Sequence, residues 1–377
     1  MILSMTLQSI SASGGSAFGG KVLFLPPFLL AFLVAFLTTP LAIWIYRKLD
    51  WLVYPEKEVK KHPAVVHQYP VPKGGGIPIF LALLITSLTF LPLDKHLKGI
   101  LFGAFLTTII GILDDRKNLN PYLRLLTNLV CALFVVGAGI GIAFLTNPLN
   151  GIIRLDQPQI SFYLLGEIRS IWVLSCLFAL VWITWCMNFI GWSGGVDGQL
   201  PGIVAIASLT TALLSLRFSA DITQWPVIIL AAITGGSYLG FLPFNFYPQK
   251  IMPGYGGKSL AGFLLATLAI LSTTKVGTLM VVLGVPLIDA LFIITRRIIK
   301  GKSPVWGGRE HLHHHLLALG WGKRRIAIFY WAIAVLLGWL ALNLSAIQKL
   351  HALFMLALIF LAFFLWLNFY QKKNFAL

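Results

Sequence analysis

Charged side chains are scarce in this sequence. Asp, Glu, Lys and Arg make up 11% of the 377 residues, whereas roughly a quarter is usual in soluble domains. Acidic residues are the scarcest, with 12 Asp and Glu against 29 Lys and Arg, and hydrophobic residues reach 58%. This composition excludes an ordinary soluble protein and predicts an all-α, polytopic integral membrane protein.

Cysteines are also few, and their placement excludes a disulfide framework. Cys131, Cys176 and Cys186 all fall within apolar runs and show no pairing pattern, which indicates buried free thiols. The chain shows no tandem repeat, no separate soluble domain and no nucleic-acid-binding module. Residues 1–23 are rich in Ser and Gly and lack the positive start of a cleavable signal, so they predict a disordered extracytoplasmic tail.

Long apolar runs are abundant, and each is close to the roughly 17–25 residues that cross a bilayer. They predict about eleven transmembrane helices in one domain over residues 24–371, followed by a short cytoplasmic tail, 372–377. The runs at 99–113, 201–216 and 258–272 are the shortest. The other eight runs are 24–46, 77–93, 122–146, 171–190, 226–244, 276–293, 326–345 and 351–370.

The basic residues predict how these helices are oriented. With the N-terminus outside, 21 of the 29 Lys and Arg residues fall in segments on the inner side. The positive-inside rule then places the C-terminus in the cytoplasm of a cell whose inner membrane holds the chain. Attraction of the net charge of +17 to anionic lipid is an additional reading of the same residues. The longest outer segment, 147–170, predicts a loop with a short strand or a surface helix.

Several of the rare carboxylates lie at span ends on the predicted cytoplasmic side. Asp114 and Asp115 are adjacent, and two charged neighbours require a cation, a base or a divalent metal nearby. A solvated helix end flanked by Arg116 and Lys117 is the alternative. Asp289 lies within an apolar run, where an ionisable residue indicates either a functional site or a structural partner on a neighbouring helix, such as Asn188 or Arg124.

Three glycine-rich turns occur on the same side. They are "YPVPKGGGIPIF" (69–80), "MNFIGWSGGVDGQLPG" (187–202) and "MPGYGGKSLAGFLLAT" (252–267). Each turn could present backbone N–H groups to an anion, although a hinge or turn at a membrane boundary also favours glycine. Together with the carboxylates, these turns predict a cytoplasmic site for a phosphorylated substrate, with Mg²⁺ as a plausible cofactor.

A histidine cluster follows in "GREHLHHHLLALGWGKRR" (308–325). A zinc site is disfavoured because no cysteine is near and adjacent histidines point to different faces of a helix. A clamp for a diphosphate or for the uridine side, a structural role and a metal site are the readings considered, and the clamp is favoured.

Four of these segments resemble the polyprenyl-phosphate N-acetylhexosamine-1-phosphate transferase superfamily (glycosyltransferase family 4), which includes the phospho-N-acetylmuramoyl-pentapeptide transferases. "PVPKGGGIPIF" resembles its P-V-P-R-x-G-G segment, and "GILDDRKNLNPYLRLLTN" resembles its D-D segment. "VPLIDALFIITRR" resembles its intramembrane Asp before paired arginines, and "REHLHHHLL" resembles its H-x-H-H segment. The resemblance covers roughly residues 40–370.

This resemblance implies transfer of a phospho-sugar from a UDP-sugar to polyprenyl phosphate, with release of UMP, in an early membrane step of cell-wall or surface-glycan synthesis. The implied partners are UDP-N-acetylhexosamine or UDP-MurNAc-peptide, polyprenyl phosphate, the bilayer and, as a further candidate, a second copy of the chain; nucleic acid is not among them. The implied catalytic residues are Asp114, Asp115 and Asp197, of which Asp115 and Asp197 would hold Mg²⁺. The implied substrate-binding residues are Lys73, Gly75, Gly76, Arg124, Asn188, Lys258, Arg309, His311, His313 and His314.

Two motifs depart from the superfamily pattern. In its N-x-x-N-x-x-D-G-x-D-G turn, Gly191 and Gly194 replace an Asn and an Asp. In its G-D-x-G-S turn, Tyr255 replaces an Asp that binds metal, and Lys258 ends the turn. These changes put ordinary Mg²⁺ binding in question, and the Lys258 charge could partly replace the metal. A homologue that binds UDP-sugar or lipid phosphate without turnover is one alternative. A lipid or nucleotide-sugar transporter is another, but it would need polar residues through the midplane and on both faces.

Overall fold

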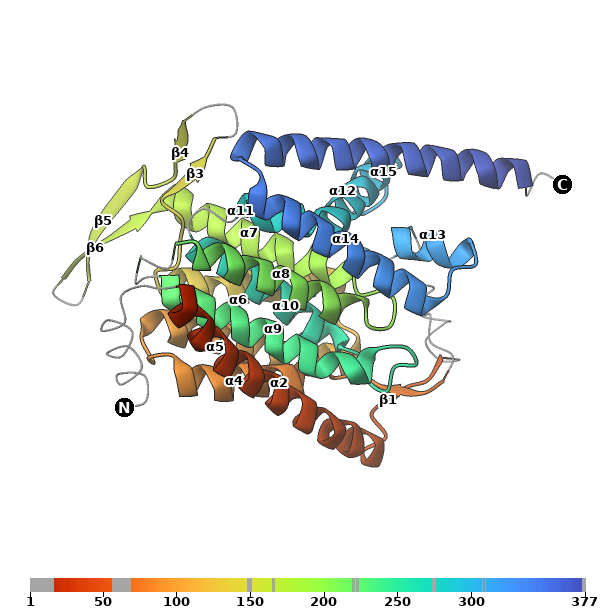
Figure 1. The fold of residues 1–377 in the computed structure, drawn as a ribbon, viewed down its shortest axis with the longest axis horizontal. Helices are drawn as coiled ribbons and strands as arrows, with labels where there is room; N and C mark the ends of the chain where they lie inside the picture. Colours follow the sequence, from red (N-terminus) through yellow and green to blue (C-terminus); the bar gives the residue numbers. More distant parts are fainter. Residues whose placement is uncertain are drawn as a thin grey trace.

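The fold is a bundle of roughly parallel and antiparallel helices, seen in a computed structural model that describes residues 17–55, 69–147, 151–164, 167–218, 221, 224–272, 276–306, 308 and 310–374 (Figure 1). The helices are α2 (Ala17–Lys48), α4 (Gly76–Phe90), α5 (Lys95–Lys117), α6 (Pro121–Gly137), α7 (Val173–Trp192), α8 (Gln199–Leu216), α9 (Trp225–Asn245), α10 (Gly254–Leu271), α11 (Val276–Val282), α12 (Gly284–Ile299), α13 (Leu312–Ala318), α14 (Lys323–Asn343) and α15 (Ala346–Asn374).

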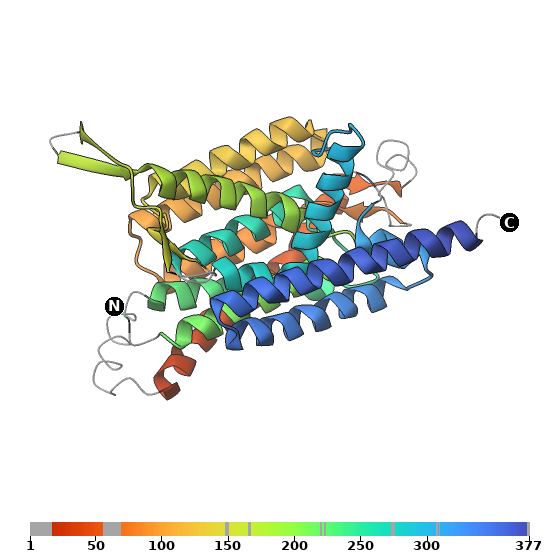
Figure 2. The ribbon, with the colours of Figure 1, turned by 90° about the horizontal axis from the view of Figure 1, so that it is seen from above.

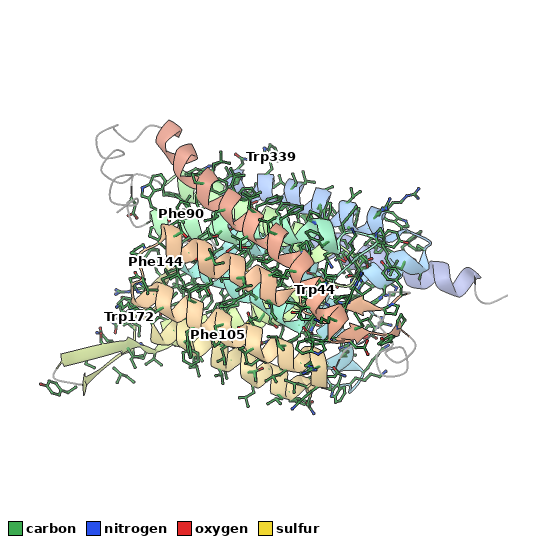
Figure 3. The ribbon with its side chains drawn as sticks, turned by 90° about the horizontal axis from the view of Figure 1, so that it is seen from below. Trp44, Phe90, Phe105, Phe144, Trp172 and Trp339 are labelled. Atoms are coloured by element: carbon green, nitrogen blue, oxygen red, sulfur yellow. The ribbon has the colours of Figure 1, made fainter. Side chains whose placement is uncertain are left out.

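Helices α9 and α10 form the centre of the bundle. Their apolar windows are 78% and 83% buried, against 28% for α2 and 11% for α15. Helix α9 packs against α2 and α8, and α10 packs against α7 and α5. Figure 2 shows α14 and α15 along one side of the bundle and α5 and α6 along the opposite side. Large apolar side chains such as Trp44, Phe105 and Trp339 lie exposed on the outer surface (Figure 3). An apolar outer surface around a buried core is what a bilayer-spanning bundle requires, so the chain is a multi-pass membrane protein.

The number of spans differs from the sequence-based expectation. Among the described residues, eight helices are long and apolar enough to cross a membrane, or nine if α11 and α12, bent by 82°, form one broken span. Helices α4 and α6 are apolar but have only 15 and 17 residues. Each predicted run is therefore helical in part, whereas the count of eleven spans is not confirmed.

Short strands form at both ends of the bundle. At one end, β3 (Phe144–Thr146) pairs with β4 (Ile152–Arg154), and β5 (Gln159–Leu164) pairs with β6 (Glu167–Trp172), all antiparallel. Within segment 147–170, strands therefore form where a loop with a short strand or surface helix was expected. At the opposite end, β1 (Leu52–Val53) pairs with β2 (Val71–Pro72), close to α13 (Figure 1).

The two predicted tails lie partly outside the described residues, which omit 1–16 and 375–377. Where the chain is described, helix extends further than expected at both ends. Helix α2 already begins at Ala17, within the predicted tail 1–23, and α15 continues to Asn374, beyond the boundary placed at 371.

Glycines bring α4, α5 and α10 into backbone contact near one end of the bundle. A Cβ atom on Gly111 in α5 would lie 2.2 Å from the Gly256 Cα in α10, and one on Gly76 in α4 would lie 2.8 Å from the Gly257 nitrogen. Only glycine permits approaches this close. The crossing places the last turn of α5, with Asp114 and Asp115, beside the first turn of α10.

Candidate functional site

A cavity of about 350 Å³ opens at the end of the bundle that carries β1, β2 and α13. Its walls come from the ends of α5, α7 and α9, the start of α10, and the segments that flank them. Eight of the residues predicted as site residues line it: Lys73, Asp114, Arg124, Asp197, Lys258, His311, His313 and His314. Asn188, Gly75 and Gly76 do not line it, and Arg309 lies outside the described residues.

The first glycine-rich turn positions Lys73 by pairing with the chain that leads into α10. Met252 accepts from the Gly75 N–H at 2.9 Å and donates its own N–H to Pro72 at 2.9 Å. A Cβ atom on Gly75 would lie 2.4 Å from the Phe241 ring. In this structure Gly75 and Gly76 therefore permit close packing, and the side chain that reaches the cavity is that of Lys73.

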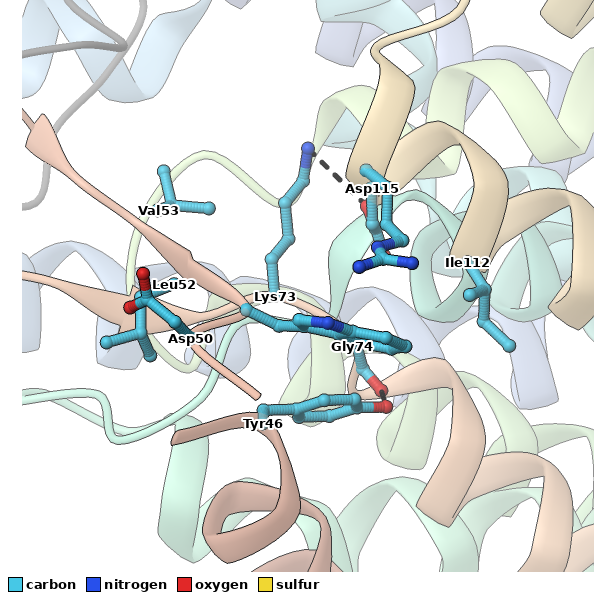
Figure 4. A pocket seen from close by; sticks show the side chains of 10 residues that line it. Tyr46, Asp50, Leu52, Val53, Lys73, Gly74, Ile112 and Asp115 are labelled. Atoms are coloured by element: carbon cyan, nitrogen blue, oxygen red, sulfur yellow. Dashed lines mark hydrogen bonds and ion pairs between the residues drawn. The ribbon is translucent and has the colours of Figure 1, made fainter. Parts of the chain in front are cut away.

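Asp114 and Asp115 are both buried, and each has its own cation. Asp114 accepts from Arg124 Nε at 2.5 Å and from the Leu119 N–H at 3.1 Å. Asp115 lies 3.4 Å from Lys73 Nζ (Figure 4) and accepts from the Tyr255 N–H at 2.8 Å. Separate counter-ions remove the repulsion expected of adjacent carboxylates, and burial distinguishes this pair from a solvated helix end.

A second cavity of about 190 Å³ adjoins the first, and Lys73 lines both. Asp115 lines this smaller cavity together with Tyr46, Trp51 and Arg116 (Figure 4). The Arg116 guanidinium lies 3.9 Å from the centroid of the Trp51 ring, and the Tyr46 hydroxyl donates to the Gly74 carbonyl at 3.1 Å. The Lys73–Asp115 ion pair therefore stands where two cavities meet.

Asp197 lies in the turn between α7 and α8 and is 2% exposed. Its carboxylate accepts from the Gln249 N–H at 3.3 Å and lies 3.5 Å from Lys323 Nζ. Asn245 joins the same two turns, since its side chain accepts from the Gly198 N–H at 3.1 Å and donates to the Ile251 carbonyl at 2.9 Å. Asn245 and Gln249 line the cavity, and sequence reasoning missed both; the only signal was a pair of amides at the end of an apolar run.

Asn188 and Asp289 have partners other than those considered from the sequence. Asn188 donates to the Thr184 carbonyl of its own helix at 2.7 Å. Asp289 lies 2.7 Å from His311 Nδ1 and accepts from the Leu312 N–H at 3.0 Å. Because a carboxylate on Nδ1 favours the proton at that nitrogen, His311 is oriented with Nε2 free to accept.

His313 is buried among the turns rather than displayed as a cation. A Cβ atom on Gly195 would lie 1.8 Å from His313 Nε2, so the ring occupies the space beside that glycine. Burial lowers the pKa of His313 well below its usual value, and the neighbouring histidines add to this effect. His313 Nδ1 has no hydrogen-bond partner within the described chain. The cluster therefore offers at least one neutral, unsatisfied ring nitrogen at the cavity wall.

Lys258 differs from the other cations of the site. Its side chain lies along the α7–α8 turn, where a Cβ atom on Gly194 would be 3.0 Å from Lys258 Cε and one on Gly191 would be 3.6 Å from Lys258 Cβ. It lines the cavity, and no hydrogen bond or ion pair of its ammonium group is found among residues the structure describes.

Comparison with known proteins decides the family. The sequence profile of glycosyl transferase family 4 matches residues 97–273, a stretch that contains Asp114, Asp115, Asp197 and Lys258. The chain belongs to this superfamily of polyprenyl-phosphate sugar-1-phosphate transferases.

Relatives from several bacteria cover most of this family 4 chain. A probable undecaprenyl-phosphate N-acetylglucosaminyl 1-phosphate transferase of Bacillus subtilis is 27% identical over 337 residues, 87% of each protein. A decaprenyl-phosphate N-acetylglucosaminephosphotransferase of Mycobacterium leprae is 26% identical, over 82% of this chain and 81% of the relative. The phospho-N-acetylmuramoyl-pentapeptide-transferase of Bacillus subtilis is 28% identical, over 84% of this chain and 96% of the relative.

The Mg²⁺ expected of the family does not fit the side chains of this member. Within the part of the chain that is described, no three His, Cys, Asp or Glu residues are grouped as a metal site would need. Asp114, Asp115 and Asp197 are each paired with a cation. The Tyr255 hydroxyl lies 2.9 Å from Asn128 Oδ1 and 3.2 Å from the Arg124 carbonyl, where it contacts none of the three carboxylates. Magnesium binding by Asp115 and Asp197 thus stays a prediction that this arrangement does not favour.

Proposed function

We propose that this family 4 member transfers a phospho-N-acetylhexosamine from a UDP-sugar to polyprenyl phosphate and releases UMP. The observation that carries the proposal is the pair of adjoining cavities that share Lys73, with Asp115 in the smaller one and Asp114 in the larger. A transfer between two phosphate-bearing substrates needs two neighbouring sites with positive charge between them. The relatives named above, which act on polyprenyl phosphates, support the same reaction.

In the proposed reaction, an oxygen of the acceptor phosphate attacks the sugar-linked phosphorus of the UDP-sugar. The bond from that phosphorus to the bridging oxygen breaks, and the bridging oxygen leaves with the electron pair as part of UMP. Asp114 or Asp115 orients the acceptor phosphate, or removes its proton where it carries one. Lys73 and Arg124 offset the phosphate charge, and His311 and His313 bind phosphate oxygens or the uridine. Phosphoryl transfer asks a protein mainly for this positioning and charge stabilisation.

The MurNAc-pentapeptide donor is a second candidate, favoured by the 28% identity to a transferase of that substrate. Purified protein is therefore assayed for UMP release with polyprenyl phosphate and, in turn, UDP-N-acetylglucosamine, UDP-N-acetylgalactosamine and UDP-MurNAc-pentapeptide. We expect acceptor-dependent release with one N-acetylated donor and none with UDP-glucose. Absence of release with every donor would remove the proposed reaction.

We further propose that both cavities face the cytoplasm, because the basic segments predicted to lie inside are at this end of the bundle. Single cysteines at Lys117, near the site, and at Tyr163, on the exposed β5 strand, are placed in a chain without Cys131, Cys176 and Cys186. On intact cells, an impermeant thiol reagent is expected to label the cysteine at position 163. The cysteine at 117 should react only after permeabilisation; labelling of both from outside would contradict this orientation.

A further inference from the structure

Positive charge exceeds negative charge around the larger cavity. Among the described residues, Lys73, Arg124 and Lys323 are each matched by a carboxylate, namely Asp115, Asp114 and Asp197. Lys258 is the cation left over. An ammonium group held among buried helices without a counter-charge is destabilising, so the arrangement is completed by an anion.

The space that Lys258 occupies exists because of the glycines in the facing turn. Its aliphatic chain passes Gly191 and Gly194, the two positions where the family pattern has an Asn and an Asp. Those side chains would fill this space, and an Asp at 194 would neutralise the ammonium. In this chain, the missing carboxylate at 194 and the missing carboxylate at 255 both leave the Lys258 charge available.

A second, independent feature marks the same cavity as a binding site. His313 is 2% exposed and lines the cavity, yet its Nδ1 atom has no hydrogen-bond partner within the described residues. Buried polar atoms are rarely left unsatisfied in folded proteins. A ligand that brings hydrogen-bonding oxygens and negative charge would satisfy both His313 and Lys258.

We propose that Lys258 binds a substrate phosphate directly, in the place of a divalent cation, so that phosphate binding by this protein needs no divalent metal. This inference rests on the proposed function for its substrates, which are the diphosphate of the donor and the phosphate of the lipid acceptor. Lysine suits the role because its ammonium is a compact point charge with three donors. The three carboxylates, each held by a cation or a backbone N–H, are not needed as metal ligands.

The test is binding of two probes, UDP and a short-chain polyprenyl phosphate, to the purified full chain by calorimetry in detergent, with EDTA and with Mg²⁺. For the wild type we expect UDP affinity to be the same in EDTA and in Mg²⁺. Loss of one charge-assisted hydrogen bond in Lys258→Met should weaken binding about tenfold or more. Lys258→Arg, which keeps the charge, should retain most of it. Lys98→Met, which removes an exposed charge at the other end of α5, is the matched control.

Each outcome decides the matter. Loss of wild-type binding of both probes in EDTA would overturn the inference, and this measurement does not depend on any variant folding. Equal affinity of wild type and Lys258→Met for both probes would overturn it as well. Weakening confined to the polyprenyl phosphate would support the inference and assign Lys258 to the acceptor. UMP release is measured on the same samples: its absence with metal-independent UDP binding would reject the proposed transfer, but not the role of Lys258 in binding.

Discussion

Replacing Asp115 by Asn is expected to lower UMP release about 100-fold or more, the scale typical of a positioned acid–base group. The substitution keeps the size of the side chain and removes its negative charge. Asp115 stands where the two cavities meet, 3.4 Å from Lys73 Nζ, so it can orient an acceptor phosphate that enters beside that lysine. The same loss is expected for Asp114→Asn, which deprives Arg124 of its buried partner.

Initial rates of UMP release at saturating donor and acceptor would test this pair. Asp156→Asn is the control, because Asp156 is paired with Arg154 near the β3–β4 hairpin, at the end of the bundle away from both cavities. Thermal denaturation would show whether the variants fold, which we expect because the amide can keep the hydrogen bonds from Leu119 and Tyr255. Near-normal rates for both Asn variants would exclude the carboxylate pair from the mechanism.

Much of the site could be predicted because its residues share one simple property. They lie at the ends of helices that alternate in direction, so loops far apart in the sequence meet at the same end of the bundle. Lys73, Asp114, Asp197, Lys258 and His313 come from five separate segments and line one cavity. Topology gathers such residues even when the packing of the helices is unknown.

What could not be predicted depends on packing and on local competition for hydrogen bonds. Asn188 was expected to bind substrate, but its amide is bonded to the carbonyl four residues earlier, a local interaction that no motif reveals. Asn245 and Gln249 were missed because their role arises only when two turns meet. The run at 276–293 reads as one continuous span, whereas the structure breaks it by 82° before Gly284, with Pro286 in the first turn of α12.

Replacing Tyr255 by Asp is expected to make the protein respond to Mg²⁺. The Tyr255 N–H already donates to Asp115, so a carboxylate at this position would stand beside Asp115 and close to Asp114. Three neighbouring carboxylates form the oxygen-rich group that Mg²⁺ prefers. The added charge would also cancel the positive excess provided by Lys258, so that phosphate binding without metal should become weaker than in the wild type.

The measurement is UMP release across a Mg²⁺ titration that starts in EDTA. We expect a flat response for the wild type and a rising one for Tyr255→Asp. Tyr255→Asn is the matched control, since it loses the same aromatic contacts with Arg124 and Asn128 without adding charge, and its response should stay flat. Tyr255→Phe, which loses only the hydroxyl, separates the effect of that hydrogen bond.

The titration also separates a metal-free enzyme from a homologue that has lost turnover. A wild type that is inert with every UDP-sugar, together with a Tyr255→Asp variant that becomes active with Mg²⁺, would mean that the replaced carboxylate had ended catalysis in this chain. A wild type that is active in EDTA, with a Tyr255→Asp variant that needs Mg²⁺, would mean that position 255 decides which cation serves the phosphates. A folded Tyr255→Asp variant whose activity ignores Mg²⁺ would show that position 255 does not face the reacting phosphates, and the account of this substitution would then be wrong.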